Sequence, residues 1–204
     1  MKFRFFLILA LSVAHLGQAE VFSFSNDPID VVIPSVEKDL LTLQLCIAGI
    51  RKNGVNIRRI IVVSKNKLTD QAEWFGEKMY PFSLSDVALA LAKGDGQKQE
   101  LLLQKGGRAG WYYQQLLKLY AFLVIPDISS NILVLDSDTV FLNPVTFLND
   151  ENGGMYNPGI EYHPPYFQHG ALLIPGFYKC FPDYSGISHH MIFHDASCLY
   201  TFHP

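Results

Sequence analysis

Cysteine, clustered positive charge and long apolar segments are all scarce in this sequence. Its 204 residues include three cysteines, Cys46, Cys180 and Cys198, without the spacing of a metal site. An odd number of thiols argues against a disulfide framework, and the apolar helical pattern around Cys46 is typical of a buried free thiol. The net charge is -3 and the basic residues are scattered, so no nucleic-acid partner is expected.

The beginning of the chain has the pattern of a processing signal. Basic residues precede a short apolar stretch at residues 5–14, and small residues follow at Gly17 and Ala19. This order predicts a signal peptide over residues 1–19, and therefore a secreted or periplasmic protein. The alternative is an uncleaved signal that anchors the chain in a membrane. No other segment reaches the roughly 20 apolar residues that a membrane span requires.

After a linker at residues 20–28, strand and helix patterns alternate. The β-branched runs at residues 29–35 and 57–64 predict buried strands, with a helix at residues 37–52 between them. The next segments are expected to be a short strand, a helix, a polar and Gly-rich loop, and an amphipathic helix, at residues 79–82, 87–92, 93–107 and 110–124. With a strand ending near residue 135, this order predicts one domain with a three-layer α/β/α, Rossmann-like, mostly parallel sheet.

The most informative segment is NILVLDSDTVFL at residues 131–142. A buried strand here ends in two carboxylates, Asp136 and Asp138, one residue apart. Side chains alternate along a strand, so both carboxylates are expected on the same side of the sheet edge. Two such groups can hold a hard divalent cation, whose open positions take phosphate oxygens. The alternative is that both residues only shape the turn after the strand.

Several motifs in order resemble a known family. The first strand IDVVIPS and the ILVLDSDTVFL segment are similar to the nucleotide-binding half of GT-A-fold glycosyltransferases. GWYYQQLLKLYA, EYHPPYF and SHHMIF, at residues 110–121, 161–167 and 188–193, more closely resemble a bacterial domain-of-unknown-function family regarded as glycosyltransferase-like. The resemblance covers residues 29–194.

The resemblance implies metal-dependent sugar transfer from a UDP- or GDP-linked nucleotide sugar to a glycan or lipid acceptor. Asp136 and Asp138 would bind Mn²⁺ or Mg²⁺ against the diphosphate of the donor. Pro34 and Ser35, in the turn after the first strand, would line the nucleotide pocket. Independently of the family, a carboxylate-held metal suits this reaction, because negative charge develops on the leaving diphosphate.

Further substrate contacts are expected from the helix at residues 110–124 and its approach. Arg108 and Lys118 can contribute positive charge to a diphosphate, Arg108 by a bidentate contact. The alternative for Arg108 is a solvated loop charge. Trp111, Gln114, Gln115 and Lys118 recur at helical spacing and share one face, which would suit a sugar ring and its hydroxyls. The alternative is an ordinary solvated face with Trp111 half-buried.

Histidines and prolines are concentrated in the last third of the chain. His189 and His190 are candidates for a general base, and because they are adjacent only one is expected to face the site. The aromatic, Pro-rich stretch at residues 156–167 is expected to be an acceptor-side loop or, alternatively, a crossover packed on the sheet. Residues 195–204 show no helix or strand pattern and predict an irregular tail. Since GT-A-type relatives continue with further helices, a truncated or frame-shifted chain without activity is one interpretation.

Three functional hypotheses follow. The first is the metal-dependent glycosyltransferase. The second is an exported, non-catalytic glycan- or envelope-binding protein on a degenerate GT-A scaffold. It would reconcile the outward-directed signal with the cytosolic location of nucleotide sugars in bacteria. The third, a phosphohydrolase that uses the same carboxylate pair, lacks a partner acid soon after the pair.

Overall fold

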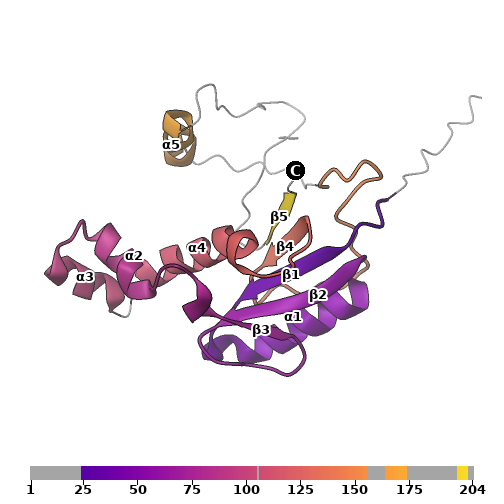
Figure 1. The fold of residues 1–204 in the computed structure, drawn as a ribbon, viewed down its shortest axis with the longest axis horizontal. Coiled ribbons are helices and arrows are strands. Elements are labelled where there is room, and N and C mark those ends of the chain that lie inside the picture. Colours follow the sequence, from indigo (N-terminus) through magenta and orange to yellow (C-terminus); the bar gives the residue numbers. More distant parts are fainter. Residues whose placement is uncertain (1–23, 105, 156–163, 174–196, 202–204) are drawn as a thin grey trace, which may run out of the picture.

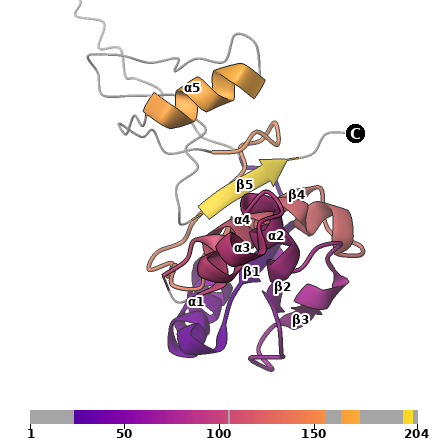
Figure 2. The ribbon, with the colours of Figure 1, turned by 90° about the vertical axis from the view of Figure 1, so that its left-hand side faces the viewer.

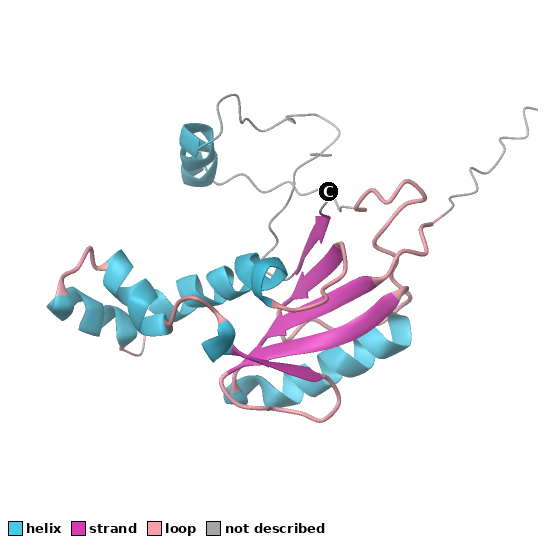
Figure 3. Cartoon of the chain, viewed as in Figure 1, coloured by secondary structure: helices cyan, strands magenta, loops and turns pink. Residues whose placement is uncertain are grey.

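The computed structural model describes residues 24–104, 106–155, 164–173 and 197–201. In these residues one sheet has the strand order β3-β2-β1-β4-β5 (Figures 1 and 3). The parallel strands are β1 (Ile29–Pro34), β2 (Ile57–Ser64), β3 (Glu73–Gly76) and β4 (Asn131–Leu135). At the edge, β5 (Ser197–Thr201) pairs antiparallel with β4. The predicted α/β class with a mostly parallel sheet is confirmed, and the order of the four parallel strands is consistent with a Rossmann-like fold.

Alternating apolar residues of the strands cover both faces of the sheet. On one face, Val31 and Ile33 of β1 belong to a core cluster with residues of α1 (Leu40–Asn53), among them Leu43 and Ile47. On the opposite face, Val32 clusters with residues of α4 (Ala109–Val124). A β1 that is buried along its whole length therefore requires a helix on each side.

Along the chain, two shorter helices come between β3 and α4. A capping box in which Ser83 and Asp86 bond each other's backbone starts α2 (Leu84–Leu91). The carboxylate of Asp95 accepts hydrogen bonds from two backbone N–H groups at the start of α3 (Gly96–Leu103). Figure 2 shows α2, α3 and α4 gathered together, and the three helices pack against one another. A last helix, α5, spans Pro164–Leu173.

Four sequence predictions were wrong in their details. The short strand is at residues 73–76, and a 3-10 turn follows at residues 77–79 where the strand was expected to begin. The predicted loop at residues 93–107 contains α3, because Asp95 caps its polar sequence. Residues 197–201, in the predicted irregular tail, form a strand because their backbone pairs with β4. Residues 164–167 of the predicted acceptor-side loop begin α5, and residues 156–163 lie outside the described part.

The other elements lie close to their predicted positions. The helix predicted at residues 37–52 is a 3-10 turn followed by α1, and the helix predicted at residues 110–124 begins one residue earlier. Cys46 is buried and free, as expected. Within the described ranges, no helix has the length and apolar character needed to cross a membrane.

Candidate functional site

The strand order reverses between β1 and β4. From β1 the chain adds β2 and then β3 on one side, whereas β4 lies on the other side of β1. Val32 pairs with Val134, so Pro34 and Asp136, each two residues further on, follow at neighbouring carboxyl ends. Ligands of open α/β sheets bind at such a reversal, outside the carboxyl ends of the strands. The fold therefore brings two of the predicted motifs to one place.

The end of β1 holds an unsatisfied hydroxyl. Pro34 is buried and closes the strand, and the N–H of Ser35 donates to the carbonyl oxygen of Val63 at 3.0 Å. Ser35 is only 6% exposed, and its Oγ has no hydrogen-bond partner in the described part of the chain. A buried hydroxyl without a partner costs roughly 1–3 kcal/mol. Such a group is typical of a position that a ligand or an ordered water satisfies.

The carboxylate pair after β4 forms a tight turn. The N–H of Thr139 donates to the carbonyl oxygen of Asp136 at 3.1 Å, with Ser137 and Asp138 at the two central positions. Ser137 is buried, Asp136 is half-buried and Asp138 is exposed. Asp136 and Asp138 therefore do shape a turn, and this turn presents them at the carboxyl edge of the sheet.

Two side chains of α4 contact Asp136. The Nζ atom of Lys118 lies 2.7 Å from Asp136 Oδ1, and Gln114 donates to the same oxygen from 3.3 Å. The side chains of Lys118 and Asp136 are 11% and 22% exposed. Gln114 and Lys118 are four residues apart, so they share a helix face. The sequence analysis placed both residues on one helix face and expected Lys118 to meet a diphosphate, whereas in the structure Lys118 neutralises a carboxylate.

On the other side of the turn, α1 contributes a thiol. Sγ of Cys46 donates to the carbonyl oxygen of Asp136 at 3.8 Å. Burial, together with the negative charges of Asp138 and Asp136, raises the pKa of Cys46 to about 12. Both carboxylates thus lie near one buried thiol, which stays protonated and unreactive at neutral pH. Sequence reasoning treated Cys46 only as a core residue.

The start of α4 carries a small aromatic and cationic cluster. The guanidinium carbon of Arg108 lies 5.1 Å from the centre of the Trp111 ring and 6.0 Å from that of Tyr112. The two rings meet edge to face at 4.9 Å. Arg108 is exposed but is held by the rings, so it differs from a freely solvated charge. Trp111 precedes Gln114 by three residues, or about 4.5 Å along the helix, and Gln115 is half-buried.

The donor chemistry of the turn fits a hard divalent cation. Asp136 and Asp138 offer carboxylate oxygens, which Mg²⁺ and Mn²⁺ prefer. In the described ranges no three His, Cys, Asp or Glu side chains come together as a metal site. Two carboxylates alone would leave coordination positions of such a cation open to phosphate and water oxygens. The predicted general-base candidates His189 and His190 lie outside the described residues.

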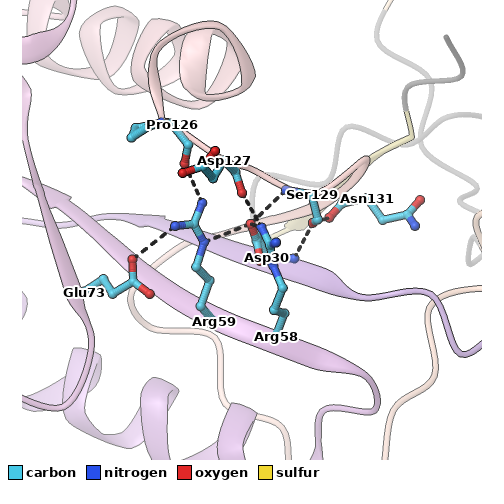
Figure 4. A network of polar contacts seen from close by, with 8 residues as sticks. All are labelled: Asp30, Arg58, Arg59, Glu73, Pro126, Asp127, Ser129 and Asn131. Carbon is cyan, nitrogen blue, oxygen red and sulfur yellow. Dashed lines mark hydrogen bonds and ion pairs between the residues drawn. The ribbon is translucent and has the colours of Figure 1, made fainter.

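A second polar network, which the sequence analysis missed, lies at the amino ends of the strands (Figure 4). The fully buried Asp30 accepts two hydrogen bonds from Arg58, at 2.8 and 2.6 Å, and one from Arg59 at 3.1 Å. The backbone N–H of Ser129 donates to it at 2.9 Å. Burial alone would raise the pKa of Asp30, but these hydrogen bonds outweigh it and hold the pKa below its usual value. A single carboxylate in an apolar strand was the signal that could have revealed this network.

This network borders a cavity of about 550 Å³. The cavity lies between the end of α1, the start of β2 and the segment before β3, and its walls include Arg51, Arg58, Arg59 and Glu73. It is at the amino end of the strands, away from the carboxylate turn. Because ligands of parallel sheets bind at the carboxyl edge, we place the candidate site at the turn rather than in this cavity.

Neither the comparison with protein-family models nor that with curated proteins gives a match for this chain.

Proposed function

We propose that the protein binds a nucleotide sugar at the junction of β1 and β4 and transfers its sugar to a glycan or lipid acceptor. The fold would then be a three-layer α/β/α domain of GT-A type. The observation that carries this proposal is the Asp136–Ser137–Asp138 turn, which follows β4 beside the end of β1, where the strand order reverses. The Oγ of Ser35 at the same edge, which has no hydrogen-bond partner among the described residues, supports a ligand there.

Each residue of the site has a role in this proposal. Asp136 and Asp138 would hold Mn²⁺ or Mg²⁺, which when bound offsets the charge of the diphosphate leaving group. Pro34 and Ser35 line the nucleotide pocket. Lys118 adds positive charge near the diphosphate.

Other residues would bind the parts of the substrate beyond the diphosphate. Trp111 offers a ring on which a sugar stacks, with Gln114 and Gln115 as hydrogen-bonding amides and Arg108 as a further cation for phosphate. His189 or His190 would accept the proton of the acceptor hydroxyl.

The proposal is tested by thermal unfolding with UDP and with GDP, each in Mn²⁺, in Mg²⁺ and in a chelator. A nucleotide at 100 times its dissociation constant should stabilise the protein by about 2.7 kcal/mol, and only with metal present. Asp127→Asn serves as a control, because Asp127 is an exposed turn residue and Asn tolerates its positive φ of 52°. If neither nucleotide shifts the transition in a metal-dependent way, the proposal is wrong.

One observation favours the second hypothesis, a non-catalytic glycan-binding protein. The ammonium group of Lys118 already neutralises Asp136, so the turn is stable without a metal. The exposed Trp111 and Tyr112 would then bind carbohydrate directly. Saturable binding of glycans in chelator, lost in Trp111→Ala, would support this function over the first.

We also propose that residues 1–19 are a signal peptide. The protein would then be released to the periplasm or the exterior. Sequencing the amino terminus of the exported protein should give Glu20 as the first residue. Recovery of a membrane-bound chain that starts at Met1 would instead support the uncleaved anchor.

A further inference from the structure

The ion pair between Lys118 and Asp136 occupies the carboxylate that a metal would need. The ammonium lies 2.7 Å from Oδ1, and the lysine side chain is 89% buried. The lysine follows Leu117, which is buried in the core cluster of this face, so the helix that carries it is fixed against the sheet. Gln114, which holds the same oxygen, is neutral and does not compete with a cation for charge.

We infer that Lys118 is an exchangeable counter-ion: a divalent cation displaces its ammonium from Asp136, and the released ammonium then binds the diphosphate. This inference rests on the proposed function and adds its order of events. A lysine ammonium is a compact charge on a flexible four-carbon stem, so it can move between two oxygens while its helix stays in place. The carboxylate loses no neutralisation in the exchange, because one cation replaces another.

The exchange couples the metal to the nucleotide. Diphosphate that binds the Lys118 ammonium removes a competitor from Asp136, so it strengthens metal binding. By linkage, the metal must strengthen diphosphate binding by the same factor. A lysine that only braced α4 against β4 would add nothing to the coupling that direct contact between metal and diphosphate supplies.

The test is a titration with Mn²⁺, followed by the loss of the free-ion signal in electron paramagnetic resonance, with and without UDP or GDP. In Lys118→Met, Mn²⁺ alone should bind about tenfold more tightly than in the wild type, equivalent to about 1.4 kcal/mol. The nucleotide should strengthen Mn²⁺ binding in the wild type and much less in Lys118→Met. Lys98→Met, at an exposed position of α3, controls for the change in net charge. Mn²⁺ binding that is unchanged or weaker in folded Lys118→Met overturns the inference.

A second readout uses the wild-type protein and so does not depend on the folding of the variant. Amine acylation mapped by peptide mass spectrometry should modify Lys118 slowly without metal and several-fold faster with Mn²⁺, while Lys98 is modified equally in both. Labelling of Lys118 that is unchanged or slower with Mn²⁺ overturns the exchange. Neither readout with Mn²⁺ alone requires a nucleotide. A failure of UDP and GDP to bind would therefore refute the proposed function separately.

Discussion

The Nζ atom of Lys118 lies 2.7 Å from Oδ1 of Asp136, and this contact joins the middle of α4 to the turn that ends β4. On the other side of the same turn, Cys46 of α1 donates to the carbonyl oxygen of Asp136. Helices on both faces of the sheet thus fix one loop at its carboxyl edge. A loop held in this way keeps Asp138 in place although the residue itself is exposed.

Replacing Asp138 by Asn separates its binding role from its role in the turn. We expect Asp138→Asn to abolish the metal-dependent stabilisation by nucleoside diphosphate. The free energy of unfolding without ligand should stay within about 0.5 kcal/mol, as is usual for exposed positions, or rise slightly as repulsion from Asp136 is relieved. Thermal unfolding with chelator and with Mn²⁺ plus nucleotide measures both effects. A loss of about 1 kcal/mol without ligand, with nucleotide binding intact, would show that Asp138 serves only the turn.

Replacing Asp30 by Asn should destabilise the fold strongly without affecting nucleotide binding. The change leaves the guanidinium groups of Arg58 and Arg59 without their buried partner. Breaking a buried ion pair costs about 3–5 kcal/mol, and we expect about 3 because the Arg58 side chain is 41% exposed. Urea unfolding measures the difference. Glu73→Gln, which loses a 3.3 Å contact of Arg59 to an exposed carboxylate, should cost less than about 1 kcal/mol.

The contribution of Asp30 should also depend on pH. Its pKa in the folded protein is below the ordinary value of 3.8, so its stabilisation is present above that pH and is lost as the pH falls through the folded pKa. The difference in unfolding free energy between wild type and Asp30→Asn should therefore be constant near neutral pH and shrink below about pH 4. A difference that does not change between pH 7 and pH 3 would contradict the ionised network.

The sequence was sufficient to predict the elements whose pattern is local. The β-branched runs became β1 and β2, and the apolar run before Asp136 became β4. The helices between these strands predicted that the strands run parallel. Only the resemblance predicted that Ser35 lies near Asp136. About 100 residues separate the two, and a local sequence pattern does not determine the order of strands in a sheet.

The details that were missed depend on tertiary partners. β3 is short and lies beside β2, and β5 exists through pairing with β4, so neither shows a clear alternation of its own. The partner of Lys118 could not be read from helical spacing, which gives its face but not what that face meets. The Asp30 network likewise needs Arg58, Arg59 and Ser129 to converge from two other segments.

Gly49 lets α1 pass close to the segment after β4, so replacing it should destabilise the fold. A Cβ atom at Gly49 would lie 2.9 Å from the backbone nitrogen of Phe141 and 3.2 Å from its oxygen. Gly49→Ala must push this segment from α1, and overpacking of this kind costs about 1–3 kcal/mol. Gly110→Ala in α4 is the matched control, since nothing lies within 4 Å of its Cβ, and it should stabilise by up to about 1 kcal/mol. Equal effects of both substitutions in urea unfolding would rule out the close approach.

Glu77 should weaken the fold at neutral pH. Burial raises its pKa above the ordinary value of 4.5, although the Tyr113 hydroxyl donates to Oε2 at 3.3 Å and lowers it in part. The folded state therefore binds the proton more tightly than the unfolded state, and stability falls as the pH rises through this range. Glu77→Gln keeps an acceptor for Tyr113 without the charge, so its melting temperature should exceed that of the wild type at pH 7. The gain should vanish near pH 4. Glu100→Gln, at an exposed position of α3, should show no such dependence, and an equal shift in both variants would refute the role of burial.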